Sequence, residues 1–304
     1  MATRRPVALL FVDGLGWGEP DPERNPCWSY GGRLLRWPVA GRPGEPVSVA
    51  HGGWAVPLDA CLGIGGLPQS ATGQTTLLTG INAQAVQGRH LSGFPGPTLR
   101  GVLLAHSLLK QVHDRGRKAA FFNTFRSPFF DWPRERQLRM SATTVANLAA
   151  DLPFFDVPDM AAGRSLYQDF TGVELRELGF DAPRLSPAQA GDVLAINLGL
   201  HDLLLYEYFL TDKAGHTGER ARCEDQLARY DAFLEAVLEG RPDGVLVVLC
   251  SDHGNIEDLH VKTHTRNPVP LAAWGPGARE FVAGKTRLDE VTPAIVARCC
   301  GSSS

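Results

Sequence analysis

Short apolar runs that end in acidic side chains constrain the fold of this 304-residue chain more than any other feature. Asp13, Asp212 and Asp252 each stand at or just beyond the end of such a run, and segments with helical spacing lie between the runs. Strands that alternate with helices are typical of a doubly wound, mostly parallel sheet that is covered on both faces. Functional residues of such sheets gather beyond the carboxyl ends of the strands. We therefore predict that the three carboxylates lie at one edge of the sheet.

The apolar patterns also give the expected elements and their order. We predict buried strands over residues 6–12, 119–123, 203–210 and 244–250, because each run is short, apolar and bounded by turn or polar residues. We predict amphipathic helices over residues 99–115, 187–198 and 221–239, and the second of these has Ser186 as its N-cap and Pro187 in its first turn. Residues 124–185 are rich in aromatic, Arg and Pro side chains. We expect this stretch to be a small insertion or lid within a single domain that spans residues 1–304.

Composition excludes several classes of function. The formal net charge is only −3, so the chain has no electrostatic footprint for nucleic acid or for an anionic membrane. Its apolar runs are too short to span a bilayer. The run over residues 6–12 is followed by no small-residue cleavage site, which favours a strand over a signal peptide. The six cysteines form no CxxC pair and are expected to be buried thiols. We expect a cytoplasmic protein.

Asp and His residues in the C-terminal third have spacings that suit metal ligands. Asp212 and His216 are four residues apart and can reach one cation if the backbone between them is helical, although Asp212 could equally cap a helix. Asp252 and His253 are adjacent at a strand end, where either a metal site or an ordinary polar loop is possible, and His264 follows eleven positions later. Together these residues suggest a mixed Asp/His set for two divalent cations. Carboxylates and imidazoles suit Zn or Mn.

A candidate nucleophile lies in the Gly-, Ser- and Thr-rich segment over residues 65–80. A hydroxyl at the start of a helix lies in positive potential from free backbone N–H groups, which favours both an alkoxide and a bound phosphate. Ser, Thr and Gly are also common at ordinary helix caps, so the segment alone leaves both interpretations open.

The motifs taken together resemble the ordered motif set of the alkaline phosphatase superfamily. The matching segments are Phe-Val-Asp-Gly at 11–14, the hydroxyl-rich segment at 69–80, Asp212-x-x-x-His216, Ser-Asp-His-Gly-Asn at 251–255 and His-Thr-Arg-Asn-Pro-Val-Pro at 264–270. Within the superfamily, they are most similar to the branch of cofactor-independent phosphoglycerate mutase and phosphopentomutase. The resemblance covers roughly the first 95 and the last 115 residues, and it implies a three-layer α/β/α sandwich.

The resemblance also implies a role for each matched residue. Ser70 would be the nucleophile, because the nucleophile of the family lies ten positions before the glycine that corresponds to Gly80. Thr75 is the fallback. The first cation would be held by Asp212, His216 and His264, and the second by Asp13, Asp252, His253 and the Ser70 oxygen. Candidate contacts to the substrate phosphate are Arg266 and Lys213. We expect Asn255 to brace the turn that carries Asp252 and His253.

The expected function is dinuclear metal-dependent phosphoryl transfer on a small phosphorylated metabolite. The related mutases carry a large cap domain, whereas the stretch over 124–185 is only about 60 residues long. We therefore expect hydrolysis of a small phosphate monoester through a phosphoserine intermediate. A phosphomutase is the second candidate, and a phosphodiesterase or nucleotide pyrophosphatase is the third. A non-catalytic metal-binding protein is the last candidate.

Overall fold

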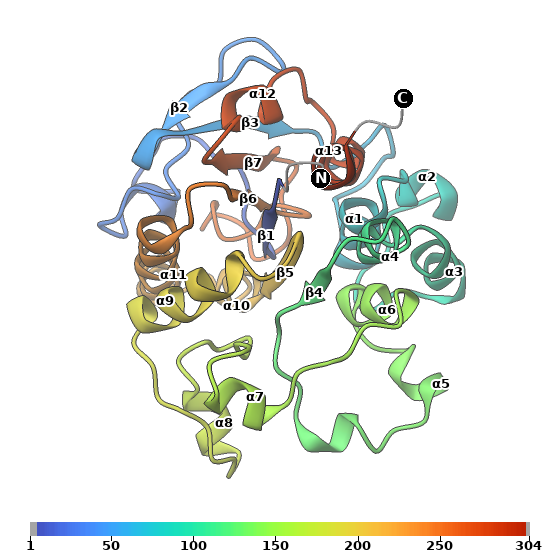
Figure 1. Ribbon diagram of the computed structural model, residues 1–304. Helices are drawn as coiled ribbons and strands as arrows, with labels where there is room; N and C mark the ends of the chain where they lie inside the picture. The colour runs from blue at the N-terminus through green and yellow to red at the C-terminus, as the bar shows by residue number, and fades with distance from the viewer. Residues whose placement is uncertain (1–4, 302–304) are drawn as a thin grey trace.

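A computed structural model describes residues 5–301 and confirms the α/β class. Seven strands form one sheet with helices on both faces (Figure 1). The strand order is β2-β3-β7-β6-β1-β5-β4. The strands are β1 (Val7–Val12), β2 (Val47–Val49), β3 (Gly53–Leu58), β4 (Ala119–Phe121), β5 (Leu203–Tyr208), β6 (Leu246–Cys250) and β7 (Val269–Trp274).

The sheet is mixed, so the expectation of a mostly parallel sheet is only partly confirmed. The strands β4, β5, β1 and β6 pair in parallel, whereas the pairs β6–β7, β7–β3 and β3–β2 are antiparallel. The connection from β6 to β7 contains no helix that could carry the chain across the sheet. The chain therefore returns beside β6 in the opposite direction.

Helices cover the two faces of the sheet in separate layers (Figure 1). One layer contains α1 (Ser70–Thr79), α3 (Pro97–His106), α4 (Leu108–His113), α6 (Ala142–Ala149) and α13 (Val291–Cys300). The other contains α9 (Pro187–Leu198) and α11 (Arg220–Gly240), which pack against each other. Alternate residues of β1 face the two layers: Leu9 belongs to the first core and Leu10 to the second. The two cores confirm the three-layer sandwich.

Short helices complete the structure: α2 (Ala83–Gln87), α5 (Arg134–Gln137), α7 (Val157–Ala161), α8 (Val173–Glu177), α10 (Leu210–Gly215) and α12 (Ala278–Val282). None of the helices within residues 5–301 has both the length and the apolar character to cross a bilayer. All six cysteines are free thiols, and four of them are buried as expected, whereas Cys61 and Cys300 are only partly buried.

Most of the predicted elements are confirmed, and one helix is wrong. The predicted strands correspond to β1, β4, β5 and β6, and α9 has the predicted bounds with Ser186 as its cap. The single helix predicted over 99–115 is two helices, because Ser107 has non-helical backbone angles. Its hydroxyl donates to the carbonyl of Ala146 at 2.8 Å, and the same oxygen caps α4. The break therefore turns the chain toward α6.

The antiparallel half of the sheet was absent from the sequence prediction. Prolines interrupt the strand pattern in both β3 and β7, and Pro57 and Pro270 face each other in the β3–β7 register. Pro270 also lies beyond the last β7 residue that pairs with β6, so its missing N–H removes no hydrogen bond to that strand.

Residues 124–185 contain α5 to α8. Within this stretch α6 packs against α3 and α4, so it forms part of the helical layer over the sheet. Other residues of the stretch, including Arg126 and Trp132, line the pocket described below. That this stretch is an insertion or a lid stays a prediction.

Candidate active site

The carboxyl ends of three adjacent parallel strands bring the predicted acidic residues together. Because β1 lies between β5 and β6, Asp13 follows the central strand and has Asp212 and Asp252 on its two sides. The backbone N–H of Asp13 donates to the carbonyl of Tyr208 at 2.9 Å. The N–H of Gly14 donates to Oδ1 of Asp252 at 3.4 Å. The prediction that the three carboxylates share one edge of the sheet is confirmed.

The fully buried imidazole of His253 lies at the centre of this cluster. Its Nε2 atom is 3.2 Å from Oδ1 of Asp13 and 3.4 Å from Oδ2 of Asp252. The same atom is 3.0 Å from the hydroxyl oxygen of Ser70. Ser70 is the first residue of α1, so its hydroxyl faces the cluster from the N-terminus of a helix.

A second set of side chains surrounds Asp212. The ring of His264 stacks on His253, with ring centroids 3.7 Å apart, and its Nε2 is 3.6 Å from Oδ1 of Asp212. The Nδ1 atom of His264 is 2.9 Å from the carbonyl of Pro68. A carbonyl can only accept, so Nδ1 carries the proton and the lone pair of Nε2 faces the cluster.

His216 lies at the margin of the cluster. Its Nε2 is 3.3 Å from Oδ2 of Asp212, and its Nδ1 donates to the carbonyl of Lys262 at 3.1 Å. Its side chain is 45% exposed, whereas that of His264 is buried.

Two compact groups of potential ligand atoms result from this arrangement. One consists of Asp13, Asp252 and His253, and the other of Asp212, His253 and His264, with the ligand atoms of each group within 4.8 Å of one another. The first group matches the second-cation set that the resemblance implied. In the other group His253 takes the place expected for His216, which remains beside Asp212 but outside the compact set.

The electrostatics of the cluster suit cations. Burial raises the pKa of Asp13 well above its usual value, and the neighbouring Asp252 raises it further. Burial likewise raises the pKa of Asp252. Oδ1 of Asp13 and Oδ2 of Asp252 accept no well-oriented hydrogen bond from residues 5–301, although His253 Nε2 lies within ion-pair distance of both. Buried carboxylates are normally paired or bound to metal, so the donor set fits one or two divalent cations.

The two stacked imidazoles have opposite electrostatic environments. Burial alone would lower the pKa of His253, but the Asp252 and Asp13 carboxylates outweigh burial and raise it to about 10. Burial, together with a smaller effect of positive charge on His253, lowers the pKa of His264 to about 4. His264 is therefore neutral near pH 7, which is the form that binds a metal.

Three of the other predicted residues lie outside the two compact groups of ligand atoms. Thr75, the fallback nucleophile, is fully buried within α1 and donates to the carbonyl of Ala71 at 2.6 Å. Lys213 lines the pocket with its ammonium group 4.7 Å from the ring of Phe209. Arg266 is exposed and does not line the pocket.

Asn255 binds a different partner from the one we expected. Its Nδ2 donates to Oδ1 of Asp212 at 2.7 Å, so it orients that carboxylate rather than the turn that carries Asp252 and His253.

Two residues that the sequence analysis did not single out also form hydrogen bonds around the cluster. Gln74 donates to Oδ2 of Asp13 at 3.2 Å, and its position four residues after Ser70 in a helix is the signal that could have found it. The buried carboxylate of Glu257 accepts from the backbone N–H groups of Gly16 and Asn255.

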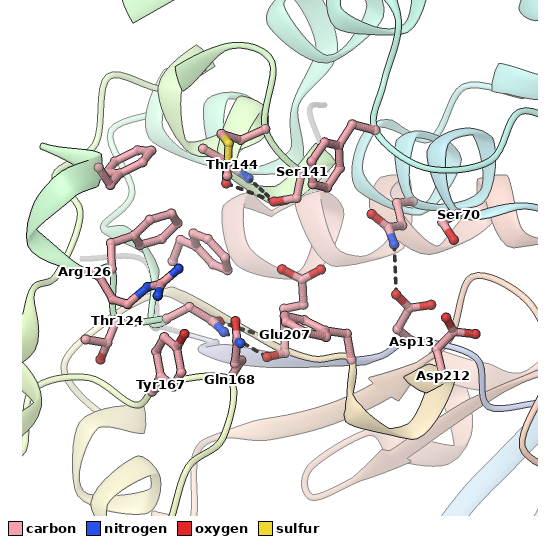
Figure 2. Close-up of a pocket in the computed structure, with 18 of the residues that line it drawn as sticks. Asp13, Ser70, Thr124, Arg126, Ser141, Thr144, Tyr167, Gln168, Glu207 and Asp212 are labelled. Carbon is pink, nitrogen blue, oxygen red and sulfur yellow. Dashed lines mark hydrogen bonds between the residues drawn. The ribbon is translucent and has the colours of Figure 1, made fainter. Parts of the chain in front are cut away.

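A pocket of about 550 Å³ opens from the cluster. Figure 2 shows Asp13, Ser70 and Asp212 at one end and Thr124, Arg126, Tyr167 and Gln168 at the other. Glu207 lies between the two ends (Figure 2). Its position as an acidic residue inside the apolar run of β5 is a signal that sequence reasoning missed.

Comparisons with known proteins agree with this fold and site. Residues 189–299 match the model of the metalloenzyme superfamily. The chain is 30% identical over 125 residues to the 2,3-bisphosphoglycerate-independent phosphoglycerate mutase of Desulforudis audaxviator, which covers 38% of this chain and 24% of that protein. It is 37% identical over 102 residues to the enzyme of the same name from Methanopyrus kandleri, which covers 33% of this chain and 22% of that protein. The matches thus span about a quarter of the length of these curated relatives.

Solved structures resemble the whole chain. The alkaline phosphatase of the Antarctic bacterium TAB5 aligns with a TM-score of 0.55 at 14% identity and covers 98% of both chains. The alkaline phosphatase of Thermus thermophilus aligns with a TM-score of 0.51 at 12% identity and covers 99% of this chain and 92% of that one. The chain has the alkaline phosphatase fold. With the superfamily match and the mutase relatives, this confirms the resemblance to alkaline phosphatase-like metalloenzymes.

Proposed function

We propose that this protein is a metal-dependent phosphoryl-transfer enzyme that hydrolyses a small phosphate monoester through a phosphoserine intermediate on Ser70. Two divalent cations, Mn or Zn, are its cofactors in this proposal, and a small phosphorylated metabolite is its substrate. Its proposed location is the cytoplasm. The observation that carries the proposal is the hydroxyl of Ser70, 3.0 Å from the imidazole that links both acidic groups.

The donor set assigns the proposed ligands. Asp13, Asp252 and His253 would hold one cation together with the Ser70 oxygen. Asp212 and His264 would hold the other, with His216 beside Asp212. Such cations, when bound, supply Lewis-acid stabilisation of the serine oxygen and of the charge on the phosphoryl group.

In this proposal Ser70 carries out an in-line displacement at phosphorus. Its Oγ forms the new bond to phosphorus and gives up its proton, while the bond from phosphorus to the ester oxygen breaks and the departing alcohol takes up a proton. Water then attacks the phosphoserine and breaks the Oγ–P bond, which yields phosphate and restores the serine hydroxyl. The first-turn amides of α1 favour negative charge on this oxygen throughout.

Amide side chains hold two carboxylates of the cluster in place. Gln74 donates to Asp13, and Asn255 donates to Asp212, so each of these carboxylates is fixed by an amide. Fixed partners lower the reorganisation needed when charge develops in the transition state. A phosphomutase is the second candidate, and the mutase relatives that match up to 38% of the chain favour it.

The nucleophile is tested by phosphoryl labelling. The protein is incubated with Mn²⁺ or Zn²⁺ and a chromogenic phosphomonoester, quenched in acid and digested, and the phosphorylated peptide is identified by mass spectrometry. We expect label on Ser70 and none in Ser70→Ala. The matched control is Thr75→Ala, which removes a hydroxyl five residues further along the same helix and should keep the label.

Three outcomes separate the candidates. Release of phosphate from the ester supports hydrolysis, whereas a positional isomer of a phosphoglycerate or sugar phosphate on chromatography supports the mutase. A protein that binds the cations but turns over no mono- or diester would be a metal-binding protein without catalysis. Label that persists in Ser70→Ala would move the role to another hydroxyl.

A further inference from the structure

The pocket beyond the cation cluster contains a carboxylate that the proposed chemistry does not use. Glu207 is on β5, and its side chain is buried and lines the pocket. Its Oε2 accepts from the hydroxyl of Thr143 at 2.6 Å. The backbone on both sides of its Cα is held by Asn123, which donates to the Glu207 carbonyl at 2.8 Å and accepts from its N–H at 2.9 Å. The carboxylate is therefore fixed, with Oε1 left for the pocket.

A buried carboxylate at this position destabilises the folded protein unless a hydrogen-bond donor or a cation is its partner. The rest of β5 is Leu and Tyr, and burial raises the pKa of Glu207 to about 7. Two hydroxyls that line the pocket already have partners: the Thr124 hydroxyl is 2.8 Å from that of Ser165, and the Thr144 hydroxyl is 2.9 Å from that of Ser141. Glu207 is the carboxylate that lines the pocket between the cation cluster and Arg126. Buried acceptors of this kind in pockets commonly fix the orientation of a ligand.

The walls of the pocket beyond Glu207 are mostly aromatic. The ring centroids of Phe125 and Phe129 are 4.4 Å apart, and the ring of Trp132 is 6.0 Å from Phe129. Arg136 lies over the ring of Trp132 at 3.9 Å and does not line the pocket. The aromatic side chains that line the pocket are Phe94, Phe121, Phe125, Phe129, Trp132, Tyr167 and Phe209.

We propose that the substrate is a phosphate monoester of an alcohol that carries a flat apolar ring and a hydrogen-bond donor, with the donor bound by Glu207 and the ring by the aromatic walls. This inference rests on the proposed phosphoryl-transfer function, because it names the alcohol part of that substrate. Figure 2 shows Ser70 at one end of the pocket, Glu207 next and Arg126 toward the other end. Phe125, Phe129 and Trp132 line the same pocket.

Size and polarity support this class over a small polar alcohol. A pocket of about 550 Å³ lies within the range that holds drug-sized ligands. Glycerol or glycerate would leave most of the aromatic wall in contact with water, whereas a ring buries that surface. A hydroxyl or amine between phosphate and ring would donate to Oε1 of Glu207 and satisfy it.

Three alkyl esters with similar leaving groups test the proposal: propyl phosphate, 3-phenylpropyl phosphate and 2-amino-3-phenylpropyl phosphate. With the cation-loaded protein we expect kcat/KM to rise about tenfold or more from the first ester to the second, and again to the third. Glu207→Gln should remove the preference for the amino ester and keep the preference for the ring. Trp132→Ala should reduce the preference for the ring. The amine also changes the acidity of the departing alcohol. This effect is the same for the wild type and for Glu207→Gln, so it cancels when these two proteins are compared.

Phe130→Ala is the matched control for Trp132→Ala. Phe130 belongs to the same aromatic segment and is 43% exposed, but it does not line the pocket, so all three ratios should stay unchanged. Folding of each variant is checked by circular dichroism and by its cation affinity. Equal kcat/KM for the three esters, or ratios that Glu207→Gln leaves unchanged, would overturn the proposal.

Binding of the free alcohols separates this inference from the proposed function. Calorimetry should show 2-amino-3-phenylpropanol bound more tightly than 3-phenylpropanol, with the difference lost in Glu207→Gln. If the alcohols bind in this order and no ester is turned over, the alcohol site stands and the phosphoryl-transfer proposal fails. If esters are turned over but neither alcohol binds, the phosphoryl-transfer proposal stands and the alcohol site is wrong.

Discussion

Replacement of Glu207 by Gln should change how the stability of the protein depends on pH. Burial raises the pKa of this carboxyl from the usual 4.5 to about 7 in the folded protein. Between these two values the unfolded chain has released the proton while the folded protein still holds it. The folded state therefore binds more protons, and stability falls as pH rises through this window.

The size of the effect follows from the width of the window. Each pKa unit corresponds to about 1.4 kcal/mol. Because the pKa of Glu207 moves from 4.5 to about 7, the free energy of unfolding falls by about 3 kcal/mol as pH rises through this window. Gln has no such titration and keeps an oxygen that can accept from Thr143. We expect the free energy of unfolding of Glu207→Gln, relative to the wild type, to increase by about 3 kcal/mol between pH 4.5 and pH 8.

Urea unfolding across this pH range measures the difference, with a chelator present in every sample. Asp13, Asp252 and the histidines are the same in both proteins, so their contributions cancel in the comparison. The control is Glu177→Gln, which changes an exposed glutamate on α8 and should leave the pH profile parallel to that of the wild type. Parallel curves for Glu207→Gln and the wild type would refute the reasoning, because they would show that the carboxyl is not held neutral by burial.

Three further predictions concern the cation cluster. Ser70→Ala should lower kcat by about a thousandfold or more on a phosphomonoester, with cation affinity measured in parallel, and a smaller loss would argue against a covalent role. Asn255→Ala should weaken cation binding about 10- to 100-fold in competition with a chelating dye, because Asp212 loses its amide donor, and unchanged affinity would contradict this. Gly73→Ala should destabilise the protein by about 1–3 kcal/mol in urea unfolding, because the added Cβ would lie 2.7 Å from the carbonyl oxygen of Asp252, and unchanged stability would show that α1 can shift freely.

Much of the acidic edge of the sheet could be predicted from the sequence, because parallel strands bring residues that follow them in the sequence to the same edge. Asp13, Asp212 and Asp252 follow three neighbouring strands, so a strand prediction alone brings them together. Local signals also sufficed for α9, where Ser186 and Gln189 form a capping box. The antiparallel half of the sheet escaped prediction because β3 and β7 each contain a proline, and the N–H that Pro270 lacks is not needed for pairing with β6.

Contacts between distant segments could not be predicted in the same way. Ser107 has an ordinary helical context in the sequence, and its break depends on a hydrogen bond to Ala146 in another helix. His216 has the spacing expected for a ligand, but the carbonyl of Lys262 holds its ring at the exposed side of Asp212. The stacking of His264 on His253 likewise depends on how the β6–β7 connection folds back.

The position of β1 between β5 and β6 has a consequence for how the proposed cation sites are assembled. The segment at 189–299 that matches the superfamily model contains β5 and β6. These two strands do not pair with each other, because β1, near the other end of the sequence, lies between them and pairs with both. The group of Asp13, Asp252 and His253 forms only when β1 is in place, because Asp13 follows that strand, whereas Asp212, His253 and His264 all lie within the matched segment. A chain in which β1 has not paired with its neighbours should therefore lack one of the two proposed cation sites.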